Sequence, residues 1–468
     1  MSSHIIEPSL VYNYVSIVEK NFLPHSNLKI KNKLVISKLE TICLIMLGSF
    51  KPSKLSAEFK VILVSLTFYN FSISLILQYV DLFAVALGIS PTLLGSFVGI
   101  GQFLSAIASL FLGWCADSQG VKKVLIITLI LFTCSLGMYG LAFCWLVIIP
   151  SIILFYIARN NVIPFADIIL IGATEARSRA TALSITRLFW ALLSSFASIA
   201  SSIVVAFEGI SANGIRPLFV ESLFFNVLAL FLVARFLRID RQRSKTRDPI
   251  KQKMTGLKVK SFFQDFQEVL KEKNLRRILL MNVIRRISMV MSSPFVYLWM
   301  VNVKSADPSI LGIVGFLGLI VYALFQLPAG IIADKIGRKK AFILLESFRY
   351  IGTIWLIISP TPAQLIVAGI LGACGLTSGA ESSGIGGASF VPWMVLNWEI
   401  VPEEKRGRWH GIISFMSFLN IFVGLCAGVM WEAGLMVQVL ILPLILEVCF
   451  VLPLLLTTPE THQLAALD

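Results

Sequence analysis

Twelve apolar stretches follow one another through almost the whole of this sequence, separated by short polar turns. An α-helix needs about 20 mostly apolar residues to cross a bilayer, and its backbone groups are then bonded within the segment. We therefore predict an all-α polytopic membrane protein with twelve spanning helices. The stretches are residues 61–87, 91–115, 124–146, 147–172, 180–206, 217–237, 278–301, 309–332, 341–360, 364–398, 410–432 and 435–457.

The tenth stretch is longer than one simple span. Its Gly-rich part, residues 369–387, is expected to be partly a loop or a kink. Eleven or thirteen spans therefore remain alternatives to twelve.

The composition supports a membrane protein and argues against nucleic-acid binding. Only 14% of the residues are charged, and the mean hydropathy is +0.84, whereas soluble domains carry about 25% charged residues. The net charge of +14 is concentrated in alternate turns, as expected for cytoplasmic loops. We expect a multi-pass plasma-membrane protein in a lipid bilayer, with both termini cytoplasmic. The basic residues of these turns are Lys122, Lys123, Arg177, Arg179, Lys335, Arg338, Lys339, Lys340, Lys405, Arg406 and Arg408.

Three polar segments divide the chain. Residues 1–58 form a cytoplasmic lead with an interfacial helix expected near 33–50, and 458–468 form a tail. The basic linker 238–275 contains one-sided helical spacing, which predicts an amphipathic helix on the membrane surface. The cysteines and histidines show no metal-ligand spacing, so we expect no metal and no cofactor. The remaining segments, 59–237 and 276–457, are the predicted bundles.

An internal repeat relates these two bundles. GWCADSQGVKK at 113–123 returns as GIIADKIGRKK at 330–340, 217 residues later. The match extends back without a gap to Pro91 and Pro308, which indicates duplication of a six-helix unit. A weaker sequence similarity relates EARSRATAL at 175–183 to EIVPEEKRGRWHG at 399–411.

The repeated pattern G-x-x-x-D-x-x-G-x-[KR]-[KR] resembles the signature of the major facilitator superfamily. RGRWHG at 406–411 and PET at 459–461 are also similar to that superfamily, and the resemblance covers about residues 59–460. It implies a monomer of two six-helix bundles around a central cavity that opens alternately to each side. It also implies a transporter of a small solute rather than an enzyme, with a proton or ion gradient as the driving force.

The resemblance implies that the signature turns are gating elements. Asp117 would face the start of the eleventh helix and Asp334 the start of the fifth, where a helix N-terminus carries about half a positive charge. Topology alone would explain the basic residues but not the paired aspartates. Gly113 and Gly330 would allow close helix approach. The signature residues are Gly113, Asp117, Gly120, Lys122, Lys123, Gly330, Asp334, Gly337, Arg338, Lys339 and Lys340.

Ionisable residues inside spans are functional candidates, because they are costly there. Arg159 resembles the arginine of the family's fourth-helix motif, although the Gln-Gly that follows in the motif is missing. Asp81 is either a proton site or a rim residue. Asp167 and Arg187 are expected either to pair or to contact substrate. The candidate substrate or proton residues are Asp81, Arg159, Asp167, Arg187, Arg286 and Glu381.

In the second half, Arg285 and Arg286 face about 100° apart, so we expect one of them to face the cavity. The spacing of Glu346 and Arg349 predicts a local ion pair. Glu447 has no evident partner in the sequence and is expected to be protonated.

The substrate is less defined than the fold. Arg159, Arg187 and Arg286 favour an anionic or zwitterionic solute. The sequence has no GxxxxGK[ST] phosphate loop, so ATP is not expected to drive transport directly. A multidrug efflux antiporter is an alternative, although residues 187–206 lack the Gly and Pro typical of its fifth helix. A non-transporting receptor on the same fold is another, in which the lead or the linker would have to signal.

Overall fold

The computed structural model describes residues 56–174, 179–237, 271–374, 383–401 and 406–458, and the regular secondary structure within them is helical. The interfacial helix expected near 33–50 lies outside these residues. Most of the linker, with its predicted amphipathic helix, and the tail from residue 459 also lie outside them.

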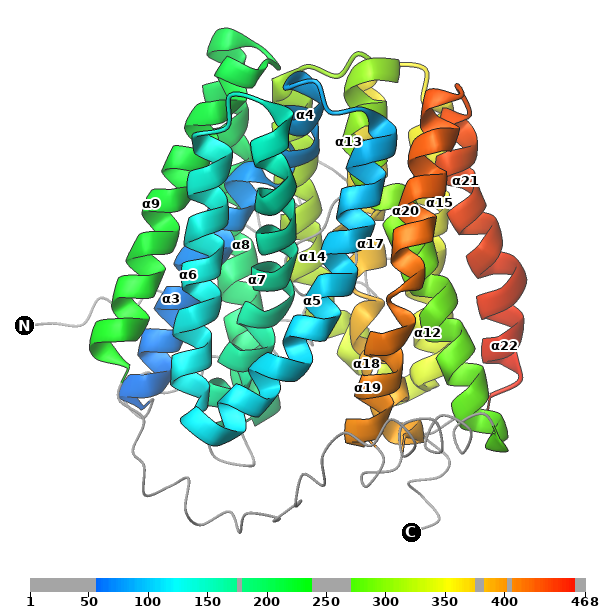
Figure 1. The fold of residues 1–468 in the computed structure, drawn as a ribbon. Helices are drawn as coiled ribbons and strands as arrows, with labels where there is room; N and C mark the ends of the chain where they lie inside the picture. Colours follow the sequence, from blue (N-terminus) through cyan, green and yellow to red (C-terminus); the bar gives the residue numbers. More distant parts are fainter. Residues whose placement is uncertain (1–55, 175–178, 238–270, 375–382, 402–405, 459–468) are drawn as a thin grey trace, which may run out of the picture. The chain divides into compact units, whose positions relative to one another are not determined.

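The first half consists of six crossings, the first of which is interrupted (Figure 1). Three unwound residues separate its two helices, yet together they are long and apolar enough for one span, Ala57–Ala86. The helices are α3 (Ala57–Ile76), α4 (Val80–Ala86), α5 (Pro91–Gln119), α6 (Val121–Gly140), α7 (Trp145–Gly172), α8 (Arg179–Glu208) and α9 (Ala212–Phe236).

The second half repeats this order with more interruptions. Its first crossing combines α12, a 3₁₀ turn, α13 and a π-helical turn, and its fourth combines α16, α17 and α18. The helices are α12 (Lys273–Ser292), α13 (Val296–Leu298), α14 (Pro308–Ile336), α15 (Arg338–Ile358), α16 (Leu365–Leu371), α17 (Gly384–Gly387), α18 (Phe390–Ile400), α19 (Arg406–Met416), α20 (Leu419–Glu432), α21 (Met436–Leu446) and α22 (Leu452–Leu456).

These helices confirm the predicted twelve-span fold in two bundles. Within the described ranges, ten helices are long and apolar enough to cross a membrane. The other two crossings are the interrupted ones around 278–301 and 364–398. The kink expected in the Gly-rich segment is confirmed, because α16 ends at Leu371 and Gly372 follows with a φ of 109°.

The internal repeat produces matching helix ends. Ser90 and Asp307 occupy equivalent positions, and their side chains accept hydrogen bonds from Leu93 N and Ile310 N, which caps α5 and α14. Both helices are 29 residues long, and each is followed by a glycine with positive φ, 95° at Gly120 and 97° at Gly337. The turns at these glycines define what we call the signature face. The side where α5 and α14 begin is the opposite face.

Candidate functional site

The two halves pack tightly against each other near the opposite face. A Cβ atom added at Gly424 of α20 would overlap the carbonyl oxygen of Gly95 in α5, and one added at Gly99 would overlap that of Asn420. A Cβ at Gly428 would lie 2.5 Å from the Pro91 carbonyl oxygen. Glycine at these positions therefore lets the two backbones touch and closes this face.

A carboxylate from the second half also caps the first helix of this contact. Glu432, the last residue of α20, accepts a hydrogen bond of 3.0 Å from Thr92 N at the start of α5. The positive end of a helix attracts such a group. The equivalent position in the first half is Glu208, the last residue of α8. The start of α14, which is equivalent to the start of α5, is capped by Asp307 instead. Its Oδ1 accepts a hydrogen bond of 2.9 Å from Ile310 N.

We predict that Glu432→Ala weakens closure of the opposite face. Loss of a helix cap costs about 1 kcal/mol, which lowers the ratio of closed to open molecules roughly five-fold. Labelling of Cys374, a buried thiol between the halves, by an impermeant reagent from the opposite face should accelerate by that factor. Glu208→Ala is the matched control and should leave the rate unchanged. Equal rates for both variants would exclude a role for Glu432 in closure.

The halves are less closely packed at the signature face. A Cβ atom added at Gly113 or Gly330 would meet no atom within 4 Å. The Asp334 side chain is 72% exposed and pairs at 2.8 Å with Arg338 of its own half. The close approach expected at these glycines is therefore not made in this conformation, and their role in closure stays a prediction. The side chains of Asp117 and of residues 179–183 lie outside the described part.

Two signature lysines have a role that the sequence did not reveal. Lys122 Nζ donates to the carbonyl oxygens of Ala234 and Leu237, at 3.2 and 2.6 Å, where α9 ends. Its repeat partner Lys339 donates to those of Leu456 and Thr458, at 2.8 and 2.9 Å, where α22 ends. Each lysine thus binds the negative end of the last helix in its own half. The repeat itself was the available signal, since topology alone does not require lysine at both equivalent positions.

Arg338, another basic residue of the signature, forms an ion pair within the second half. Arg338 Nη2 lies 3.5 Å from Glu399 Oε1 near the end of α18. The neighbouring Lys123 and Lys340 are exposed. These contacts connect each signature turn to its own bundle.

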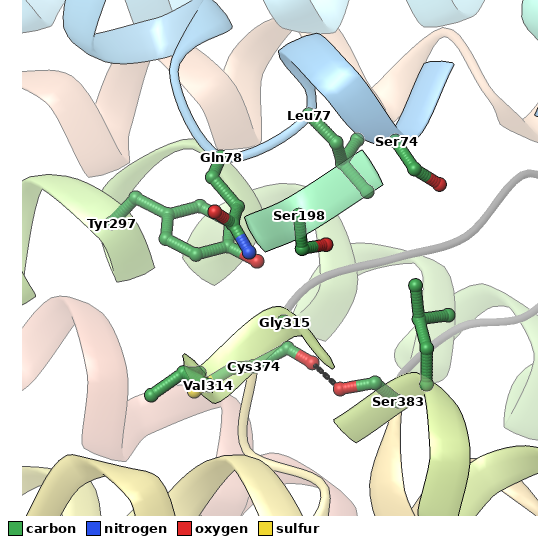
Figure 2. A pocket seen from close by; sticks show the side chains of 10 residues that line it. Ser74, Leu77, Gln78, Ser198, Tyr297, Val314, Gly315, Cys374 and Ser383 are labelled. Atoms are coloured by element: carbon green, nitrogen blue, oxygen red, sulfur yellow. Dashed lines mark hydrogen bonds between the residues drawn. The ribbon is translucent and has the colours of Figure 1, made fainter. Parts of the chain in front are cut away.

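A small pocket lies between the two halves (Figure 2). Its cavity volume is about 20 Å³, enough for about one water molecule. A solute can therefore enter only after the walls separate. The lining residues are Ser74, Leu77, Gln78, Ser198, Tyr297, Val314, Gly315, Leu319, Cys374 and Ser383.

Sequence reasoning missed this pocket because it considered mainly ionisable residues. Gln78 lies in the break between α3 and α4 of the first crossing, and Tyr297 lies in α13, just after the 3₁₀ turn of the seventh crossing. Polar residues at equivalent breaks in the two halves are the signal that would have indicated the site.

In the first half, the structure relates Asp81 to Arg159. The guanidinium of Arg159 in α7 interacts electrostatically with the Asp81 carboxylate in α4, and it lies 5.8 Å from the centre of the Phe155 ring. The predicted pair of Asp167 and Arg187 is confirmed at 2.6 Å. That ion pair neutralises Arg187.

Four charged residues of the second half form a buried network. Arg349 bonds to both Glu346 and Glu447, and Arg285 Nη1 lies 3.3 Å from Glu346 Oε1 and 3.6 Å from Glu447 Oε2. The pairing of Glu346 with Arg349 is confirmed. The prediction that Glu447 has no partner is wrong, because it contacts Arg285 and Arg349 and accepts a hydrogen bond from Tyr350 Oη at 3.2 Å.

The two adjacent arginines of α12 separate as expected from helical geometry. Arg285 is buried in the network and stacks on Trp393 at 4.8 Å. Arg286 points elsewhere and donates to Ser417 Oγ at 3.0 Å. It lines a second recess together with Asn282 and Asn420. The remaining candidate, Glu381, lies outside the described residues.

A twelve-helix membrane protein whose two related halves meet around a central pocket has the architecture of a secondary transporter. The family model of the Major Facilitator Superfamily matches residues 61–284 and 278–466, and the chain belongs to that superfamily. It is therefore a multi-pass membrane protein of a family that transports small solutes.

Solved structures of transporters share the fold. The nucleoside transporter NupG is 14% identical, with 86% of this chain and 100% of that chain covered and a TM-score of 0.63. A D-xylose–proton symporter is 15% identical, with coverages of 86% and 98% and a TM-score of 0.59. The xylose transporter XylE from E. coli, in an inward-open conformation, is 18% identical, with coverages of 87% and 98% and a TM-score of 0.59. No curated protein sequence matches this chain significantly.

Proposed function

We propose that the protein is a secondary active transporter that moves a small solute by alternating access. The observation that carries this proposal is the asymmetric packing of the two halves around the pocket. The backbones of Gly95 and Gly424 touch near the opposite face. At the signature face, a Cβ atom added at Gly113 or Gly330 would have no atom within 4 Å. Rocking of one half against the other would exchange these two arrangements.

We also propose that the signature face is cytoplasmic and that the protein lies in the plasma membrane. The basic residues of the signature turns support this orientation. In this orientation the structure is closed to the outside and less closely packed toward the cytoplasm. The lead 1–58, the linker 238–275 and the tail 458–468 are then all cytoplasmic.

Asp81 and Arg159 are the residues that we propose for proton coupling. A carboxylate inside a span is costly when charged, and a nearby guanidinium reduces that cost. Protonation of Asp81 would weaken its attraction to Arg159, so each protonation state would favour a different arrangement of α4 and α7. A coupled transporter needs such a link between proton binding and conformation. The xylose symporter with the same fold is described as a proton symporter, which is consistent with this mechanism.

We predict that Asp81→Asn abolishes solute accumulation driven by a pH gradient, because the variant cannot exchange the proton. Exchange of labelled for unlabelled solute should continue at half the wild-type rate or more. Asp167→Asn is the control, since that carboxylate pairs with Arg187, and it should retain gradient-driven uptake. Normal accumulation by Asp81→Asn vesicles would refute the coupling role.

The solute can be found by thermal stabilisation of the purified full-length protein. A ligand present at 100 times its dissociation constant adds about 2.7 kcal/mol to stability. Each stabilising compound is then tested for uptake into proteoliposomes. Removal of residues 1–50 tests the receptor alternative, since a transporter keeps its flux. Stabilisation mainly by unrelated lipophilic cations would favour the efflux antiporter instead.

A further inference from the structure

The central pocket lies where two equivalent crossings are interrupted. In the first half, α3 ends at Ile76 and α4 begins at Val80, with Gln78 between them. In the second half, α12 ends at Ser292, and a 3₁₀ turn over Ser293–Phe295 precedes α13, which contains Tyr297. The 217-residue repeat places these two breaks at the same level. Interrupted helices in corresponding positions provide polar groups for a ligand.

Gln78 is a buried polar side chain with an unsatisfied hydrogen-bond acceptor. It is only 2% exposed, and its Oε1 has no hydrogen-bond partner among the described residues. A buried acceptor without a partner is destabilising, because it has lost its hydrogen bonds to water. Figure 2 shows the Gln78 amide extending into the pocket near Tyr297 and Ser198. A ligand that donates a hydrogen bond would satisfy this oxygen.

Gly315 of α14 makes room for this amide across the boundary between the halves. A Cβ atom at position 315 would overlap Gln78 Nε2 and would lie 2.7 Å from Ser198 Oγ. Any other residue would therefore displace Gln78. The amide belongs to the first half and its space is provided by the second, so its position depends on how the halves are arranged.

The polar side chains of the pocket are all uncharged hydrogen-bonding groups. Ser74, Gln78, Ser198, Tyr297 and Ser383 can each donate and accept hydrogen bonds, and all are uncharged. No charged side chain of the described residues lines the pocket. Such groups match hydroxyls on a neutral molecule. An anion would require a cation, which these lining residues do not provide.

We propose that this pocket, once its walls separate, binds an uncharged, polyhydroxylated solute, and that Gln78 orients it through its amide. This replaces the anionic or zwitterionic solute expected from the sequence, and it rests on the proposed transport function. Leu77, Val314 and Leu319 would contact the apolar parts of the solute. Gly315 is the residue that keeps Gln78 in the binding position.

The test compares neutral and charged compounds on the purified full-length protein. Neutral sugars and polyols should raise the Tm, whereas their phosphorylated and carboxylate forms should not. Gln78→Leu should weaken binding of the best neutral compound at least ten-fold, and Gly315→Ala should weaken it although the amide is retained. Gln364→Leu is the matched control, because Gln364 also has an unpaired buried Oε1 but lies outside the pocket. It should bind normally.

Each other outcome has a defined meaning. The proposal is overturned if only charged compounds raise the Tm, or if no neutral compound does. It is also overturned if a neutral compound stabilises the wild type and both pocket variants equally. A neutral compound that binds through Gln78 but never enters proteoliposomes would refute transport and leave the pocket assignment standing. Uptake of a neutral compound that is unaffected by Gln78→Leu and Gly315→Ala would refute the pocket assignment and leave transport standing.

Discussion

Gly424→Leu is expected to abolish transport while leaving the protein folded. A Cβ atom at this position already overlaps the Gly95 carbonyl oxygen, so a leucine would hold α5 and α20 apart. The opposite face could then not close, and the protein would stay accessible from that side. Solute uptake by reconstituted protein should fall to the level of empty vesicles.

The control for this prediction is Gly172→Leu, because a Cβ atom at Gly172 meets no atom within 4 Å. Cys374 serves as the reporter of conformation, in a background where the other cysteines are replaced. In Gly424→Leu it should react with an impermeant thiol reagent from the opposite face, and in Gly172→Leu it should remain protected. Wild-type transport by Gly424→Leu would show that the contact between α5 and α20 is not part of the cycle.

Arg349→Met is expected to cause the largest loss of stability in the second half. Glu346 and Glu447 are buried, with side-chain exposures of 0% and 4%, and Arg349 bonds to both. Breaking a buried ion pair costs about 3–5 kcal/mol because a charge is left without its partner. The Tm of the purified variant should fall accordingly. Arg187→Met removes the more exposed pair with Asp167, 22% exposed on each side, and should cost about 1 kcal/mol or less.

A double variant shows whether this loss comes from the unpaired charge. Arg349→Met combined with Glu447→Gln leaves Arg285 and Glu346 as a balanced pair at 3.3 Å. It should recover more than half of the stability lost in Arg349→Met. If the double variant is less stable than the single one, packing rather than charge balance determines the effect of Arg349.

The sequence predicted the fold well because the membrane restricts the possibilities. Apolar stretches can cross a bilayer only as helices, and the repeat beginning at Pro91 and Pro308 relates the two halves directly. Local partners were also predictable, since Glu346 and Arg349 lie three residues apart on one helix. The pair of Asp167 and Arg187 could be predicted because consecutive helices are neighbours.

Long-range partners could not be predicted from spacing. Glu447 lies 98 residues from Arg349, and only helix packing brings them together. The same holds for the contact of Gly95 with Gly424 and for the Glu432 cap. The pocket residue Gln78 was overlooked for a different reason, because a neutral amide in an apolar stretch is less conspicuous than a charge. The conformational state of a transporter is also not encoded in any local pattern.

Solute uptake into proteoliposomes tests the central proposal of alternating-access transport most directly. Purified full-length protein is reconstituted with an imposed pH gradient and supplied with a labelled neutral solute that stabilises it. The solute should accumulate above its external concentration, accumulation should stop when an ionophore collapses the gradient, and Gly424→Leu vesicles should resemble empty ones. Equal entry into wild-type, Gly424→Leu and empty vesicles would contradict transport by this protein.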